Sequence, residues 1–418
     1  MVLGSVGTRV LNLLLGAVAG VVVARSLAPG GRGSYAVVVT IAGTAVALCH
    51  MSLEQAHVSM WKNEAQRRAL IANAVALGLG IGVLAAAASY GIVHLLGRSR
   101  LPVYDDRGLI LALAAVPLAL LALYTKSLVA LRARVDMLNR AMLLSAVVQT
   151  AALIGLAVIH ELSVTSVVAL WTLTSALPLL VTLPLLRPRA SELSAQVMRA
   201  ELMRGIRYHG GVALLFLLFR ADVFLVNAMK SREAVGLYAL AVTLAELVYL
   251  LSDSVAQAIV ARQASGDVED ATAITALAMR MTLLGAAGVA GALAVAGPWL
   301  LPLAYGQAFR DSVVPFLILL PGVVAFAVGR PVAALLAAVD APWLVAGLSA
   351  AAFAIDLVLA VLLIPPLGIA GAAWASTVAY TLLCLGYMSA ACSVADLNWA
   401  DFVPRMAEVR GMARPHRG

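Results

Sequence analysis

Long apolar segments are the feature that most restricts what this chain can fold into. Twelve segments of the 418-residue sequence are mostly apolar over about 20 residues or more, the length that an α-helix needs to cross a bilayer. In the first half we expect helices at about 3–24, 35–53, 69–96, 108–131, 137–159 and 163–186. In the second half we expect them at about 208–229, 234–260, 272–303, 312–338, 342–364 and 369–391. Only 12% of the residues are charged, against roughly 25% in a soluble domain, so we expect an all-α polytopic membrane protein.

An internal repeat divides the twelve segments into two sets of six. GSYAVVVTIAGTAVAL (33–48) matches GLYALAVTLAELVYLL (236–251) at an offset of 203, with seven identical positions. Ala, Val and Leu are so common in this chain that some of their matches occur by chance. The pairs less open to chance are Gly33/Gly236, Tyr35/Tyr238 and Thr40/Thr243. Membrane proteins built from such repeats are mostly transporters, with the substrate held between the halves.

Lys and Arg residues outside the segments are distributed unevenly between the two sides of the membrane. With the N-terminus in the cytoplasm, 17 of them fall on the cytoplasmic side and 8 on the outer side, which favours both termini inside. The predicted order is an N-lobe (1–186), a cytoplasmic amphipathic linker (187–207), a C-lobe (208–391) and a cytoplasmic tail (392–418). Six helices per half give both lobes the same orientation, so a pseudo-two-fold axis along the membrane normal should relate them.

Polar and basic side chains within the segments are candidates for binding an anionic substrate. They are Arg9, Asn12, Lys126, Arg220 and Arg330, and a second repeated stretch places Lys126 opposite Arg330 at an offset of 204. Ionisable groups inside a bilayer persist where they face a cavity or a partner, and Arg binds phosphate in bidentate geometry. Arg9 and Lys126 have a simpler alternative, because both lie near helix ends, from which long basic side chains extend to the headgroups.

Acidic side chains within the segments are candidates for binding a coupling ion, either H⁺ or Na⁺. They are Asp222, Glu246, Asp253 and Asp356. Arg220 and Asp222 are two residues apart on one helix, so they do not face each other and each needs its own partner. Glu246 and Asp253 share one stripe of the next helix. Buried carboxyl groups serve as proton carriers in transporters, but this stripe could instead only neutralise Arg220.

Sequence motifs of soluble enzymes are missing from the chain. It contains no GxxxxGK[ST], HExxH, GxSxG or CxxC pattern, and its six histidines are scattered. We therefore expect no enzymatic activity, no metal site and no cofactor beyond the coupling ion. The net charge of +8 comes from basic residues in short loops, which is the positive-inside pattern, so we do not expect a nucleic-acid partner.

Four segments resemble one family of membrane proteins. They are ARSLAPGGRGSYA (24–36), LEQAHVSMW (53–61), LLFRADVFLVNAMKSREAVGLYALAVTLAELVYLLSDSV (217–255) and FLILLPGVVAFAVGRPVAALLAAVDAP (316–342). They are similar to the polysaccharide flippases, also called Wzx-like oligosaccharide-lipid flippases. These belong to the multidrug/oligosaccharidyl-lipid/polysaccharide exporter (MOP) superfamily.

The resemblance implies two six-helix lobes around a cavity that opens alternately to each side of a bacterial plasma membrane. The cargo would be an isoprenoid-diphosphate-linked glycan moved from the inner to the outer leaflet, with Arg220 at the family's diphosphate-binding position in helix 7. Its partners would be the lipid-linked glycan, membrane lipids and, in addition, glycosyltransferases or a glycan polymerase.

Two other function classes compete with the flippase. One is a cation-coupled multidrug exporter of the same superfamily, although drug-exporting relatives often have an acidic residue in helix 1, where this chain has Arg9. The other is a membrane-embedded glycan polymerase or ligase, which would need a sizeable outer loop that the sequence does not show.

Overall fold

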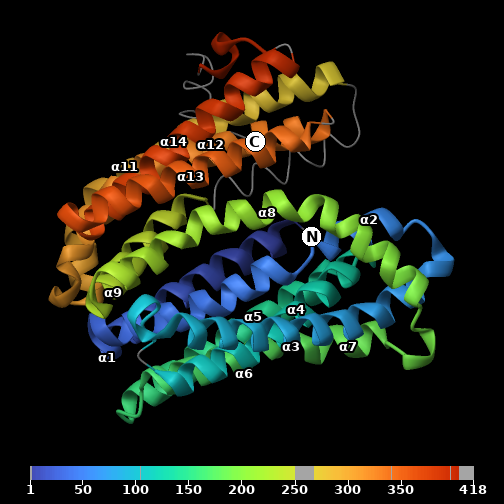
Figure 1. Ribbon diagram of the computed structural model, residues 1–418, viewed down its shortest axis with the longest axis horizontal. Coiled ribbons are helices and arrows are strands. Elements are labelled where there is room, and N and C mark those ends of the chain that lie inside the picture. The colour runs from blue at the N-terminus through green and yellow to red at the C-terminus, as the bar shows by residue number, and fades with distance from the viewer. Residues whose placement is uncertain (1, 104, 250–267, 340, 396, 404–418) are drawn as a thin grey trace. The chain divides into compact units, whose positions relative to one another are not determined.

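A computed structural model describes residues 2–103, 105–249, 268–339, 341–395 and 397–403 (Figure 1). These described residues form helices joined by turns, without a β-strand. Ten of the helical segments in this part of the chain are long and apolar enough to cross a membrane. The predicted all-α, multi-pass membrane fold is therefore confirmed.

Two differences explain why ten spans are found where twelve were expected. The first two expected segments lie in one long element, α1 (Val2–Cys49), which is broken at Ala28 by φ 54° and ψ 177°. Pro29 explains the break, because proline disfavours a helical conformation in the residue before it and has no N–H to donate. The expected segment 234–260 begins as α9 (Arg232–Ala245) and continues as a 3₁₀ turn, η3 (Glu246–Val248), before the chain leaves the described residues.

The described chain divides into two compact units. Unit 1 comprises Met1–Phe216 and Lys230–Gly236. Its further elements are α2 (Leu53–Met60), η1 (Glu64–Gln66), α3 (Arg67–Arg100), α4 (Asp106–Leu131), α5 (Val135–Val158), α6 (Val164–Ala176), α7 (Leu179–Leu186), η2 (Ala190–Glu192) and the first part of α8 (Ala195–Met229). Helix α4 packs against α3 and α6, and α1 packs against α5 (Figure 1). The close approach of α3 to α4 needs Gly82, because a Cβ there would lie 2.3 Å from the Cα of Pro117.

Unit 2 comprises Leu217–Met229 and Leu237–Gly418. Its elements are the end of α8, most of α9, η3, α11 (Val268–Tyr305), η4 (Gln307–Ser312), α12 (Val313–Ala338), α13 (Pro342–Leu367), α14 (Ile369–Val394) and η5 (Trp399–Phe402). Helix α14 packs against both α12 and α13, and α11 packs against α12. Helix α8 begins at Ala195, inside the segment expected to be a surface linker, and runs without a break into the expected seventh span.

The matched glycines of the repeat contact each other within unit 1. A Cβ on Gly33 would lie 1.8 Å from the carbonyl oxygen of Arg232, and a Cβ on Gly236 would lie 1.9 Å from that of Pro29. Pro29 and Arg232 are themselves 203 residues apart, so the two contacts are copies of each other. The backbones of α1 and α9 therefore touch at a crossing that leaves no room for a side chain. We call it the glycine crossing.

Candidate functional site

An ion pair inside unit 2 joins α8 to η3. Arg220 lies in the second half of α8, and Glu246 begins η3 directly after α9 ends. The guanidinium donates to both carboxylate oxygens of Glu246, from Nη1 at 2.8 Å and from Nη2 at 3.3 Å. The two side chains are 31% and 28% exposed, so the pair is accessible from outside the protein interior. A bidentate guanidinium of this kind presents the geometry that also binds a phosphate group.

Asp222 forms no ion pair with Arg220 and has hydrogen-bond partners of its own, as the two-residue spacing predicts. Its carboxylate is buried, and one oxygen accepts a 2.6 Å hydrogen bond from the hydroxyl of Tyr238. The other oxygen accepts from the backbone N–H of Val223 at 2.7 Å. In the first copy of the repeat, the position 203 residues before Asp222 is Ala19, and Tyr35 lies beside it in an apolar cluster. The tyrosine is thus common to both copies, whereas the acid is present in one.

Asp356 brings a second buried carboxylate to the same region. It lies in α13 and is fully buried, and its oxygens form no well-aligned hydrogen bond among the described residues, the hydroxyl of Ser376 being a polar neighbour. It is close enough to Asp222 for the two charges to interact, and the hydroxyl of Ser376 in α14 lies near both Asp356 and Tyr238. We call Asp222, Tyr238, Asp356 and Ser376 the carboxylate cluster. Two buried acids this close are favourable only when a proton or a cation lies with them.

Aromatic rings cluster near the ion pair in unit 2. The ring of Phe219 meets Phe326 and Tyr380 edge-on, those two rings are tilted at 52°, and all three lie within 6 Å of one another, with Tyr249 beside them after η3. A small cavity of about 10 Å³ lies among Asp222, Glu246, Tyr249 and Tyr380, roughly the space of one water molecule.

The remaining residues selected from the sequence fall into three groups. Arg330 lies in α12 within electrostatic range of Tyr249, so it belongs with the ion pair in unit 2. Arg9 and Asn12 lie in α1 of unit 1, and the buried Oδ1 of Asn12 has no hydrogen-bond partner among the described residues. Lys126 is exposed near the end of α4 in unit 1, and Asp253 lies outside the described residues.

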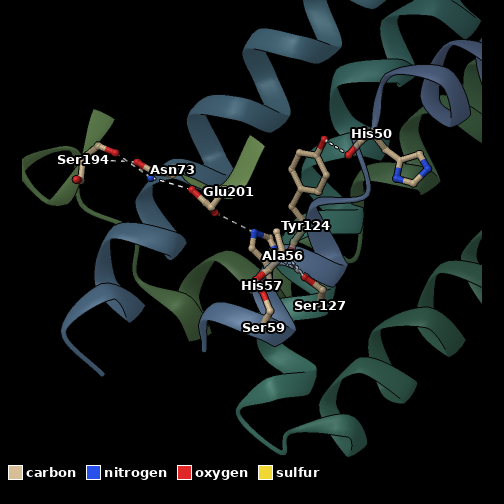
Figure 2. A network of polar contacts seen from close by, with 9 residues as sticks. All are labelled: His50, Ala56, His57, Ser59, Asn73, Tyr124, Ser127, Ser194 and Glu201. Carbon is tan, nitrogen blue, oxygen red and sulfur yellow. Dashed lines mark hydrogen bonds and ion pairs between the residues drawn. The ribbon is translucent and has the colours of Figure 1, made fainter. Parts of the chain in front are cut away.

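A buried polar network in unit 1 is the feature that the sequence did not reveal (Figure 2). The imidazole of His57 lies between α4 and α8, with Nδ1 2.7 Å from the hydroxyl of Ser127 and Nε2 3.2 Å from Glu201. Ser127 donates its own proton to the carbonyl of Tyr124, so it accepts from His57. Glu201 also accepts from Asn73 at 2.9 Å, and both His57 and Glu201 are fully buried.

The network ties the start of α8 to the rest of unit 1. The amide of Asn73 also donates to the carbonyl of Ser194 and accepts from its N–H, so α3 holds the residue that precedes α8. Further along α8, His209 donates to or accepts from Ser52 at 3.4 Å and lies 2.8 Å from the carbonyl of Leu48. In the sequence these histidines are far apart and on different segments, and no periodicity connects them. The one signal was that Glu201 is one of two acids, with Glu192, in a stretch (187–207) that otherwise has the composition of a basic linker.

Glu201→Ala should destabilise the protein strongly. The substitution leaves the buried Nε2 of His57 without the carboxylate oxygen 3.2 Å away and removes an acceptor from Asn73, and each buried polar group left without a partner costs about 1–3 kcal/mol. The thermal midpoint of the detergent-purified protein measures the loss. Glu64→Ala is the matched control, because Glu64 is 82% exposed in its pair with Arg67 and such pairs contribute less than about 1 kcal/mol. Equal midpoints for the two variants would show that the network does not hold α8.

Solved structures show the same fold at low sequence identity. The lipid II flippase MurJ in an inward closed conformation matches with a TM-score of 0.75 and 12% identity, over 96% of this chain and 89% of MurJ. A MOP superfamily transporter from Pyrococcus furiosus matches with a TM-score of 0.64 and 14% identity, over 95% of each chain. The MATE transporter VcmN of Vibrio cholerae matches with a TM-score of 0.60 and 13% identity, over 96% of this chain and all of VcmN.

A search among curated protein sequences finds no match to the chain. A family profile does match. The profile described as "Polysaccharide biosynthesis protein" covers residues 3–261, more than half of the sequence, so this chain belongs to the polysaccharide biosynthesis protein family, as its resemblance to the polysaccharide flippases predicts.

Proposed function

We propose that the protein is a flippase for an isoprenoid-diphosphate-linked oligosaccharide. It would move this cargo from the inner to the outer leaflet of a bacterial plasma membrane, with both termini in the cytoplasm, for cell-surface polysaccharide biosynthesis. Membership of the polysaccharide biosynthesis family supports the class of cargo. The fold shared with a lipid II flippase supports the type of movement. Glycosyltransferases or a glycan polymerase would supply or consume the cargo.

The observation that carries the proposal is the accessible ion pair between Arg220 and Glu246. A diphosphate offers the same pair of oxygens as the carboxylate of Glu246, with more negative charge, so it would compete for the guanidinium. Binding of the cargo would then release Glu246 and the turn η3 that begins with it. Arg330 lies near the same turn and would add a second positive charge. Alternating access would follow from such an exchange in the way that differential binding shifts a conformational equilibrium. A MATE transporter of the superfamily has been solved in inward-facing and outward-facing conformations.

Arg220→Ala should abolish export of the glycan while the protein still accumulates in the membrane. Because Arg220 is partly exposed, its removal leaves Glu246 near solvent and not in the apolar interior, so the fold should survive. Arg220→Lys should restore part of the activity, since it keeps the charge and loses the bidentate geometry. Surface glycan on cells that carry each variant, normalised to protein in the membrane, measures the effect. Normal export by Arg220→Ala would remove Arg220 from the mechanism.

The carboxylate cluster would bind the coupling ion. Its oxygen atoms from two acids and two hydroxyls fit either a shared proton or Na⁺, and the unsatisfied oxygens of Asp356 are the observation that favours a missing positive charge. Asp222 and Asp356 would hold the ion directly. Glu246 would contribute by releasing Arg220 when the cargo binds. Asp253 remains a candidate predicted from the sequence.

A cation-coupled multidrug exporter is the second candidate. It is favoured by the aromatic rings of Phe219, Phe326 and Tyr380 next to acidic groups, because aromatic faces bind organic cations. Deletion of the gene separates the two functions. Loss of surface glycan with unchanged drug sensitivity supports the flippase, whereas increased sensitivity to cationic drugs with intact glycan supports the exporter.

A further inference from the structure

Four arginines line a hollow of about 570 Å³ in unit 1. They are Arg67 and Arg68 at the start of α3, and Arg132 and Arg134 in the turn between α4 and α5. Trp61 lies on the same wall, with the guanidinium of Arg67 5.2 Å from its ring centre. The hollow is at the ends of these helices that the count of Lys and Arg assigns to the cytoplasm, and it includes none of the residues assigned to cargo or ion.

The positive charge of this hollow exceeds the negative charge next to it. Arg67 pairs with Glu64 at 2.9 Å, and Arg68 pairs with Glu192 at 3.2 Å while its side chain stays 76% exposed. Arg132 donates to the carbonyl of Leu185, which carries no net charge to neutralise it. The side chain of Arg134 is exposed and makes no hydrogen bond or ion pair with a described residue, although its backbone bonds Val129 and the start of α5. Two guanidinium charges therefore remain for a ligand.

Backbone groups add to the positive potential of the hollow. Helix α5 begins at its edge, and its N-cap residue, Arg134, does not cap the helix with its side chain. The uncapped N–H groups at a helix start attract anions. Between Arg132 and Arg134, Ala133 has φ 57°, a left-handed conformation that costs about 1 kcal/mol or more for a residue other than glycine. Such strain is often found where a turn holds side chains for a ligand.

The internal repeat shows that this part of the chain can fold without the two arginines. At the offset of 204 that aligns α4 with α12, Arg132 corresponds to Leu336 and Arg134 to Ala338. The second copy there is helical to Ala338, with no arginine. The basic turn is therefore a feature of the first copy alone, which the second copy does not share.

We propose that this hollow binds the phosphate of an anionic phospholipid headgroup. The shape of the site favours a lipid over a free anion, because one side of the hollow is apolar, formed by Ile71, Leu131 and Leu185 at the ends of membrane-spanning helices. Trp61 is the kind of residue that lies at the headgroup level of a bilayer. Basic pockets between helix ends on the cytoplasmic side are suited to phosphate headgroups, with the acyl chains along the apolar wall.

Lipid binding to the purified full-length protein tests the proposal. The delipidated protein in detergent is titrated with dioleoylphosphatidylglycerol or dioleoylphosphatidylcholine, and native mass spectrometry gives the first binding constant. The wild type should bind phosphatidylglycerol more tightly than phosphatidylcholine. Arg134→Ala should weaken that binding roughly fivefold, and the double variant R132L/R134A, which carries the residue types of the second copy, roughly thirtyfold. Phosphatidylcholine binding should not change.

Arg140→Ala is the matched control, because Arg140 is an exposed arginine on α5 that does not line the hollow. It removes one charge and should leave phosphatidylglycerol binding at the wild-type value. Arg134→Ala removes a side chain without partners, so an unchanged thermal midpoint will show that its effect is on binding. Equal phosphatidylglycerol binding by the wild type and R132L/R134A would overturn the proposal. So would displacement of the lipid by millimolar inorganic phosphate, which would identify a site for a free anion.

Discussion

Asp356→Asn should stop ion-driven transport and leave the protein at least as stable as the parent. Asp356 is fully buried without a well-aligned hydrogen bond among the described residues, so its charge is a cost to the fold that a bound proton or cation would offset. Asparagine has the same shape without the charge. We expect the gradient-dependent rate in reconstituted vesicles to fall by two orders of magnitude or more, while the thermal midpoint without the coupling ion stays equal or rises.

The dependence of stability on the salt present tests whether the carboxylate cluster binds Na⁺. A ligand that binds only the folded protein raises the midpoint with its concentration, by about 2.7 kcal/mol at a hundred times its dissociation constant. The parent should therefore be stabilised by NaCl relative to KCl if it binds Na⁺, and Asp356→Asn should not respond to either salt. Ser376→Ala, which removes a neighbouring hydroxyl and no charge, should retain most of the response. An Asp356→Asn protein that still transports under a gradient would exclude the cluster from coupling.

Gly33→Ala should prevent the protein from folding normally. The new methyl group would lie 1.8 Å from the carbonyl oxygen of Arg232, which belongs to the backbone and cannot rotate away. Overpacking in a core costs about 1–3 kcal/mol when side chains can adjust, so a clash with the backbone should cost more. Both the amount of protein in the membrane and its thermal midpoint should fall. Gly236→Ala should do the same, because its Cβ would lie 1.9 Å from the carbonyl of Pro29.

A glycine in open surroundings provides the comparison for this substitution. Gly155 lies in α5, and a Cβ there would have no atom within 4 Å. Gly155→Ala should be neutral or stabilise the protein by up to about 1 kcal/mol, since alanine is the better helix former. The double variant G33A/G236A should be less harmful than the sum of its parts, because one substitution already separates the two backbones. Normal folding of Gly33→Ala would mean that the glycine crossing is not tightly packed.

The sequence predicted the spans well because a bilayer leaves few alternatives. A backbone without water must satisfy its own hydrogen bonds, so about 20 apolar residues in a row imply a helix. The expected segment 108–131 differs from α4 by two residues at its start. The sequence could not show that α8 extends back to Ala195, because polar residues fit a surface helix and a loop equally well. Nor did it show the break at Leu177 and Pro178 between α6 and α7.

The sequence indicated which residues belong to the candidate site, but it could not show which residues from other helices contact them. Charges in apolar segments stand out, so Arg220, Asp222 and Asp356 were all identified as candidates. Their pairing depends on helix packing, and nothing in the spacing places Asp356 of α13 near Asp222 of α8. The same reason explains why His57 and Glu201, which are 144 positions apart in the chain, were not recognised as partners.

The glycine crossing has the form of an interface between two identical chains. Gly33 contacts Arg232, and Gly236 makes the equivalent contact with Pro29. The two repeats therefore touch through the same surface, as the subunits of a two-fold symmetric dimer do. A six-helix ancestor with one such glycine could have assembled as a homodimer through this contact, and any change to the glycine would then have altered both sides at once. Fusion of the two copies into one chain removed that restriction elsewhere. In this chain the copies do differ elsewhere: one has Asp222 where the other has Ala19, so the buried carboxylate is present once and not twice.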